Sequence, residues 1–230
     1  MPGGLHLGLQ KTTLLDYPGE VACTVFFAGC NFRCPYCHNP ELVKGKHPPD
    51  FLTEKQIIDF IKKRKNVLGG VCITGGEPLL STALPEIIKK IKDFGLKVKV
   101  DTNGSLPDRL MKTEADYFAM DIKTSMKKYQ LLGGTAGKTD KIMESIKYLM
   151  SGSIDYEFRT TAVPDLITIE DMWEIARMIE GAKHYAIAQY RSEKTLDPLY
   201  SNITPYPDSK IKQLAAIPAH LGIPVSVRGI

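Results

Sequence analysis

The chain has 230 residues, of which 43% are hydrophobic and 24% charged, and its formal net charge is +4. This composition is ordinary for a soluble globular protein and excludes disordered and fibrous classes. No window approaches the run of about 18 apolar residues that a membrane-spanning helix needs, so no membrane partner is expected.

The N-terminal residues and the cysteines indicate the cellular compartment. The first 20 residues lack the basic region and long apolar core of a secretory signal. Five cysteines, three of them clustered, fit a metal in a reducing compartment better than a disulfide scaffold. We therefore expect a cytoplasmic protein. The small basic excess has no aromatic interleaving, so no nucleic-acid partner is expected.

Short apolar runs alternate with amphipathic ones along the chain. Residues 20–27 are predicted as a strand, followed by helix 53–68 with Thr53 as its N-cap, strand 71–74, helix 84–94, strand 97–100, helix 107–115 and strand 117–120. The second half continues with helix 138–150, strand 156–163, helix 168–180, strand 185–190, helix 208–220 and an apolar stretch at 223–229. This order favours parallel strands with right-handed helical crossovers, in one α/β domain spanning 1–230.

Small or polar residues follow each of the first five predicted strands. They are Gly29–Cys30, Gly75–Pro78, Asp101–Gly104, Asp121–Lys123 and Pro164–Asp165. Because reactive residues of parallel α/β folds gather at the carboxyl ends of the strands, we expect these groups at one rim of the sheet.

Three cysteines follow the first strand with the spacing C-x3-C-x2-C: Cys30, Cys34 and Cys37. Structural zinc and ordinary 4Fe-4S clusters take four ligands, and a lone C-x-x-C pair would favour zinc. A second pair is missing here, because Cys23 and Cys72 fall inside predicted strands, where small buried thiols are common. A cluster held by three thiolates would keep one iron open to an outside ligand.

The motif C-x3-C-x-aromatic-C, formed by Cys30, Cys34, Tyr36 and Cys37, resembles the signature of the radical S-adenosylmethionine (SAM) superfamily. The resemblance implies a single-domain, partial (open) TIM-type (β/α)6 barrel. It also implies a 4Fe-4S cluster on the three cysteines, with SAM as the ligand of the open iron. Tyr36, Cys37 and His38 would lie near the adenosine of SAM.

The same resemblance assigns the "GGE" turn, Gly75, Gly76 and Glu77, to the methionine amino group of SAM. Glycines let the backbone approach a ligand closely, and Glu77 offers a carboxylate to an ammonium. A simple strand-to-helix turn is the alternative interpretation.

The segment "DTNG" and the later "D-x-K" are similar to segments near the SAM carboxylate in glycyl radical enzyme activating enzymes. They supply Asp101, Thr102, Asn103, Asp121 and Lys123. The two aspartates could hold a cation beside SAM, and Lys123 could donate to its ribose or carboxylate. An Asx-type turn at "DTNG" and a surface ion pair between Asp121 and Lys123 are the alternatives.

Arg159 is a cation inside a predicted buried strand and needs a partner. The resembling activases place an arginine there near SAM, and a structural ion pair is the alternative. Arg191 stands where these relatives often have histidine, so that contact to SAM stays open.

The stretch from Lys11 to Val43 looks most like the activating proteins of anaerobic ribonucleoside-triphosphate reductase. The resemblance implies that reduced flavodoxin or ferredoxin supplies an electron, that SAM is cleaved reductively to a 5'-deoxyadenosyl radical, and that this radical takes hydrogen from a glycine of a partner glycyl radical enzyme. The alternatives are a pyruvate formate-lyase-type activating enzyme, a radical SAM enzyme acting on a modified-nucleoside precursor, and a metal-binding module without catalysis.

Overall fold

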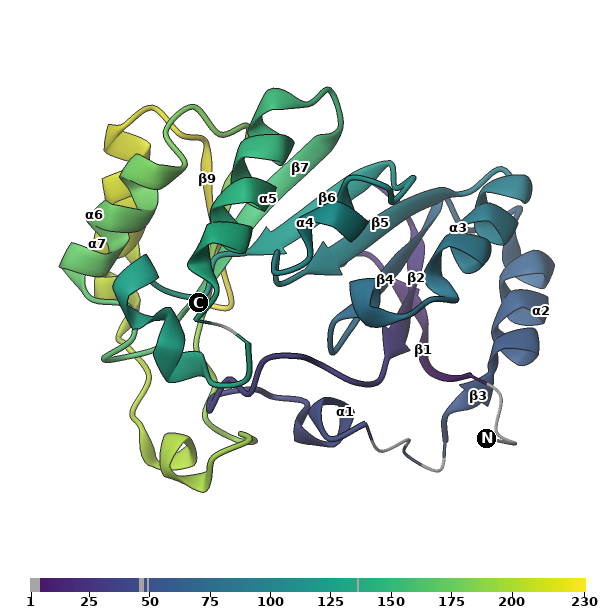
Figure 1. Ribbon diagram of the computed structural model, residues 1–230, viewed down its shortest axis with the longest axis horizontal. Helices are drawn as coiled ribbons and strands as arrows, with labels where there is room; N and C mark the ends of the chain where they lie inside the picture. The colour runs from purple at the N-terminus through teal and green to yellow at the C-terminus, as the bar shows by residue number, and fades with distance from the viewer. Residues whose placement is uncertain (1–4, 46–47, 49, 136) are drawn as a thin grey trace. The chain divides into compact units, whose positions relative to one another are not determined.

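The computed structural model describes residues 5–45, 48, 50–135 and 137–230 (Figure 1). Neighbouring strands of the sheet lie in the order β3-β1-β2-β4-β5-β6-β7-β8-β9. The chain divides into two compact units. The first comprises the residues up to Asn31, Glu41–Thr102 and Asp108–Phe118, and the second comprises Phe32–Pro40, Asn103–Pro107 and Ala119–Ile230.

The strands of the first unit are partly parallel. They are β1 (His6–Thr13), β2 (Ala22–Phe27), β3 (Leu52–Thr53), β4 (Gly70–Gly75) and β5 (Lys97–Thr102). β2, β4 and β5 run parallel, whereas β1 pairs antiparallel with both β2 and β3. The helical segments are α1 (Pro40–Val43), α2 (Glu54–Arg64), η1 (Pro78–Leu80), α3 (Leu84–Asp93) and α4 (Pro107–Leu110).

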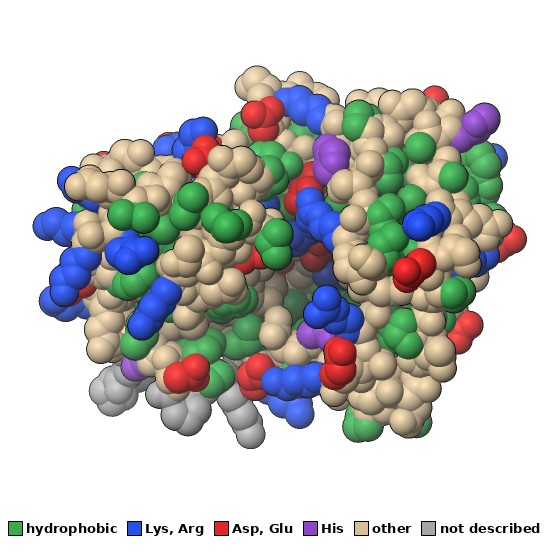
Figure 2. Space-filling model, turned by 180° about the vertical axis from the view of Figure 1, so that it is seen from behind, with side chains coloured by type: hydrophobic (Ala, Val, Ile, Leu, Met, Phe, Trp, Pro, Cys, Tyr) green, Lys and Arg blue, Asp and Glu red, His purple; other side chains and the backbone are tan. Residues whose placement is uncertain are grey.

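Helices α2 and α3 cover the strands through apolar stripes. Ile57 and Ile61 of α2 are fully buried, as are Ile87 and Ile91 of α3. Each pair is four residues apart, so both side chains of a pair lie on one face of the helix. Lysines occupy the opposite faces, and on the surface that Figure 2 presents, basic and acidic side chains are interspersed.

The second unit repeats the strand–helix order. Its strands are β6 (Tyr117–Asp121), which begins in the first unit, β7 (Asp155–Ala162), β8 (Tyr185–Gln189) and β9 (Val225–Arg228). β8 is parallel to both β7 and β9. The helical segments are η2 (Met126–Leu132), α5 (Thr139–Ser151), α6 (Ile169–Met178), η3 (Pro198–Asn202) and α7 (Asp208–His220), of which α6 and α7 lie side by side (Figure 1).

The predicted α/β class and the open (β/α)6 arrangement are confirmed. β2, β4, β5, β6, β7 and β8 are each followed by a helix, and the strand order is linear. Thr53 is the N-cap of α2, as expected. The helix expected at 107–115 is shorter, because the chain leaves α4 in a turn where Thr113 N donates to Leu110 O. The prediction of one domain stays a prediction.

The antiparallel strands β1 and β3 were not predicted. β1 is half exposed, and only Leu7, Gly8 and Thr13 of this strand are buried. A half-exposed antiparallel strand carries a weaker apolar signal than the parallel strands, which are buried on both faces. No helix in the described part of the chain combines the length and the apolar character needed to cross a membrane.

The capping box at the start of α2 gives a first prediction. The Thr53 hydroxyl accepts from Gln56 N at 3.3 Å, and Gln56 Oε1 accepts from Thr53 N at 2.9 Å. Thr53→Ala should lower the free energy of unfolding by about 1 kcal/mol, measured by urea denaturation, because a helix N–H loses its acceptor. Thr53→Ser keeps the hydroxyl and is the control. Equal losses in both variants would contradict the cap.

Candidate functional site

The three clustered cysteines are thiols placed directly after β2. Cys30 and Cys37 are half-buried, and Cys34 is 7% exposed. Cys37 N donates to Cys34 O at 3.0 Å, which folds the second and third cysteines into one tight turn. Thiolates are the ligands that hold iron–sulfur clusters, and three of them would leave one iron of a 4Fe-4S cluster for an outside ligand.

The other two cysteines are core residues, as predicted. Cys23 in β2 and Cys72 in β4 are fully buried. Burial raises the pKa of the Cys23 thiol to about 12, so it stays protonated at neutral pH. Both thiols belong to the packed core, and neither is a candidate ligand of the cluster.

The turn after β4 packs directly against the residues before Cys30. Gly75 has a φ of 118°, in the region that favours glycine. A Cβ on Gly76 would lie 2.0 Å from the carbonyl oxygen of Gly29 and 3.3 Å from Cys30 Cβ. Glu77 N donates to the same Gly29 oxygen at 2.9 Å. Glycine is therefore required here by the close approach of two backbones beside a cysteine, which fits a cradle for a bound group.

The Glu77 carboxylate is buried, with 1% of the residue exposed. Its Oε1 accepts from the Thr102 hydroxyl at 3.0 Å and from Leu79 N at 3.1 Å. These bonds cap η1 and tie the end of β4 to the end of β5. The role of Glu77 toward the SAM ammonium stays a prediction, and its structural role is a finding.

Asp101 is paired with a lysine that the sequence reasoning missed. Lys99, two residues earlier on β5, has a side chain only 1% exposed and forms an ion pair with Asp101 Oδ1. Residues two apart on a strand share a face, so the "KVKVD" pattern carried this signal. Lys97, two residues before Lys99 on the same strand, is exposed.

Asn103 forms an Asx-type turn, which is the alternative interpretation of the "DTNG" segment. Its Oδ1 accepts from Ser105 N at 3.0 Å and from the Ser105 hydroxyl at 2.6 Å. Gly104 follows with a φ of 74°. The side-chain oxygen of Asn103 thus has a local structural use.

Asp121 lies between two cations in the second unit. Its Oδ1 accepts from Arg159 Nε at 2.8 Å, and its Oδ2 accepts from Lys123 Nζ at 2.8 Å. Burial would raise the pKa of Asp121, but these two charges hold it well below its usual value. Burial likewise opposes the charge on Lys123, whose pKa Asp121 keeps raised. Arg159 was expected to need a partner for its charge, and that partner is Asp121.

Aromatic contacts hold the residues around the third cysteine. Tyr36 is 5% exposed, and its ring lies 6.5 Å from that of Tyr200. Burial raises the pKa of Tyr36. His38 Nδ1 is hydrogen-bonded to Lys194 O at 3.0 Å, and its ring lies 6.0 Å from that of Tyr190. Arg191, by contrast, is exposed.

No support is found for a separate cation. Within the described ranges, no group of three or more His, Cys, Asp or Glu side chains is arranged to hold a single metal ion. Asp101 and Asp121 each bind cationic side chains of this chain instead.

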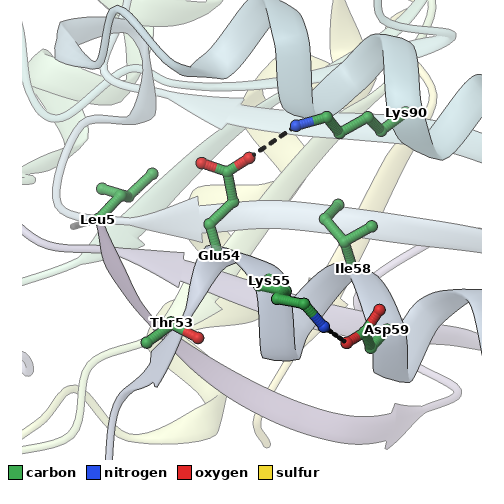
Figure 3. Close-up of a pocket in the computed structure, with 7 residues that line it drawn as sticks. All are labelled: Leu5, Thr53, Glu54, Lys55, Ile58, Asp59 and Lys90. Atoms are coloured by element: carbon green, nitrogen blue, oxygen red, sulfur yellow. Dashed lines mark hydrogen bonds and ion pairs between the residues drawn. The ribbon is translucent and has the colours of Figure 1, made fainter.

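A pocket of about 410 Å³ on the first unit contains none of the predicted site residues. Figure 3 shows its lining, with Lys90 paired to Glu54 at 2.9 Å and Lys55 paired to Asp59 at 2.6 Å. These ion pairs between helix side chains explain the polar lining, so the pocket gives no further candidate site.

Comparison with known proteins decides the family. The profile of the Radical SAM superfamily matches residues 24–180, which is more than half of the chain. The chain belongs to the radical SAM superfamily. The expected superfamily is thereby confirmed, and the chain is an enzyme of this type, for which the superfamily implies a 4Fe-4S cluster and SAM.

Relatives extend this result to the activating enzymes. A protein of Methanocaldococcus jannaschii, provisionally named a glycyl-radical enzyme activating enzyme, is 31% identical over 222 residues, covering 91% of this chain and 90% of the relative. The pyruvate formate-lyase-activating enzyme of Clostridium pasteurianum is 36% identical, covering 44% of each. A 7-carboxy-7-deazaguanine synthase of Methanopyrus kandleri is 32% identical, covering 46% of this chain and 51% of the synthase. The resemblance to the activase family is confirmed.

A solved structure agrees on the fold. Streptococcus suis SuiB, crystallised with S-adenosylmethionine, aligns with a TM-score of 0.67 at 14% identity, over 90% of this chain and 52% of SuiB. At this identity the likeness concerns the fold alone.

Asp121 gives a prediction on pH dependence. Since its folded-state pKa lies below the value of about 3.9 expected in an unfolded chain, its pairing stabilises the fold above that pH, and this contribution is lost as the pH falls toward the folded-state pKa. Asp121→Asn should lower the free energy of unfolding at neutral pH by about 2 kcal/mol, and its difference from wild type should shrink below about pH 4. Denaturation curves across this range test it. The exposed Asp108→Asn is the control, and a loss independent of pH would contradict the pairing.

Proposed function

We propose that this chain is a radical SAM activase that generates a glycyl radical on a partner enzyme. The similarity to the archaeal activating enzyme, which spans 91% of this chain and 90% of the relative, carries the proposal. The synthase relative covers only 46% of this chain. The partner that we propose is an anaerobic ribonucleoside-triphosphate reductase, on the resemblance of residues 11–43.

Cys30, Cys34 and Cys37 would hold the 4Fe-4S cluster, with its fourth iron left for SAM. The three thiols and the glycine turn against Cys30 support this assignment. When bound, the cluster and SAM would supply the 5'-deoxyadenosyl radical after one electron arrives from a flavodoxin or ferredoxin.

The remaining predicted residues would orient SAM. Gly75 and Gly76 pack closely against the backbone that leads to Cys30, and Glu77, which follows them, would bind the methionine ammonium. Asp121, fixed by Arg159, would hold the Lys123 ammonium in place for the ribose or carboxylate of SAM.

Tyr36, Cys37 and His38 would border the adenosine of SAM. Asp101, Thr102 and Asn103 would lie at its carboxylate end. Such positioning and the exclusion of water are the tasks of the chain, which needs no general acid or base.

A free cation at Asp101 and Asp121 is not supported, because each carboxylate has a cationic partner.

We also propose that residues 1–230 act as one radical SAM domain in the cytoplasm. The five thiols and the superfamily match across both units support this.

A second candidate function is a radical SAM enzyme acting on a small molecule related to modified nucleosides. The match to the 7-carboxy-7-deazaguanine synthase favours it. A pyruvate formate-lyase-type activase is the nearer alternative, supported by the Clostridium relative. The two classes differ in where the radical is left, on a protein glycine or on a free metabolite.

Electron paramagnetic resonance tests the proposed function. The protein is reconstituted anaerobically with iron and sulfide, then incubated with SAM, a reductant and either the ribonucleotide reductase or pyruvate formate-lyase. A glycyl doublet on the reductase supports the proposal, and one on the lyase alone selects the nearer alternative. SAM cleavage without any protein radical would reject the activase.

Cys37→Ala provides a prediction for the cluster. The reconstituted variant should lose most of its bound iron and sulfide and its SAM cleavage, because two thiolates cannot hold the cluster firmly. Its thermal unfolding should stay close to that of the wild type, since Cys37 is half-buried. Cys23→Ala, in the core of β2, is the control and should keep the cluster. Full cleavage activity in Cys37→Ala would remove this residue from the site.

A further inference from the structure

A row of polar side chains crosses the interior of the first unit. Thr24 on β2 is opposite Cys72 on β4, and Cys72 is opposite Lys99 on β5. Residues directly opposite one another in a sheet share a face, so these three side chains lie side by side. All of them are at most 1% exposed.

Lys99 places a positive charge in this buried row. Its Nζ donates to Cys72 Sγ at 3.7 Å, and the Cys72 thiol donates to Asp101 Oδ1 at 3.8 Å. The ion pair between Lys99 and Asp101 closes the triangle. The Asp101 side chain is 13% exposed, so its carboxylate stands between the buried ammonium and the surface.

Packing does not call for a lysine at this position. Its neighbours Val98 and Val100 are fully buried, and an apolar residue would complete the same strand. A buried ion pair is often no more stabilising than well-packed apolar residues of similar volume. The buried ammonium of Lys99 therefore indicates that Asp101 requires a cationic partner.

Asp101 has such a requirement under the proposed function, on which this inference rests. Its carboxylate would lie near the carboxylate of SAM, and two neighbouring carboxylates repel one another unless a cation neutralises them. We infer that Lys99 is a positioning residue that serves as the built-in counter-ion of Asp101, so that the carboxylate end of SAM binds beside Asp101 without a free monovalent cation. The sheet supplies this charge from its interior.

The test measures SAM binding to the anaerobically reconstituted holoprotein by equilibrium dialysis. Buffers contain sodium or potassium chloride, or choline chloride at the same ionic strength. Wild-type affinity should be the same in all three. Lys99→Met should bind SAM at least about tenfold more weakly in choline, and sodium or potassium should restore much of the loss, because a small cation can occupy the place of the ammonium.

Lys97→Met is the matched control, since Lys97 lies on the same strand with its side chain 62% exposed. It should behave as wild type. Lys99→Gln is a second variant, whose amide keeps a donor toward Asp101 but lacks the charge. It should show the same dependence on sodium or potassium, and it keeps the test usable if Lys99→Met does not fold.

The outcomes separate this inference from the proposed function. A wild-type protein that needs sodium or potassium to bind SAM overturns the inference, whatever the variants do. So does cation-independent binding by a folded Lys99 variant, whether its affinity is unchanged or reduced, because a purely structural pair would give that result. Failure of the wild-type holoprotein to bind SAM in any buffer would instead reject the proposed function.

Discussion

The in-register parallel pairing of β2 and β4 is the constraint on which the candidate site depends. Phe27, the last residue of β2, is opposite Gly75, the last residue of β4. Both chains therefore leave the sheet at the same level, and the turn at Gly76 meets the Gly29 carbonyl beside Cys30. A side chain at Gly76 would separate these backbones, so the strand register and the two glycines act together.

Internal charge compensation is the second feature of the fold. Asp101 has Lys99, and Asp121 has Arg159 and Lys123. The charges of Arg159 and Lys123 hold the pKa of Asp121 below its usual value, and the ion pairs hold both carboxylates in one orientation. Residues that must present charge to a charged ligand benefit from such fixed partners, because no reorganisation is needed when the ligand arrives.

The relatives show how widely this scaffold is used. Activating enzymes and a deazaguanine synthase match the same chain, and SuiB shares its fold at 14% identity. A fold with this range of uses does not by itself identify a substrate. The extent of the match to the archaeal activating enzyme, rather than the cysteine motif common to the superfamily, is what favours a protein substrate.

The sequence by itself determined the cysteine motif, the family and the alternation of parallel strands with helices, because spacing and apolar periodicity are local properties. It also placed Glu77, Asp101 and Asp121 correctly at strand ends. Only the tertiary structure showed that Lys99 is buried beside Asp101, that Arg159 pairs with Asp121, and that the Gly29 backbone leaves no room for a side chain at Gly76. These depend on which strand lies beside which and in what register. Such long-range pairing leaves no periodic signal along the chain, so the sequence did not indicate which neighbouring strands these side chains contact.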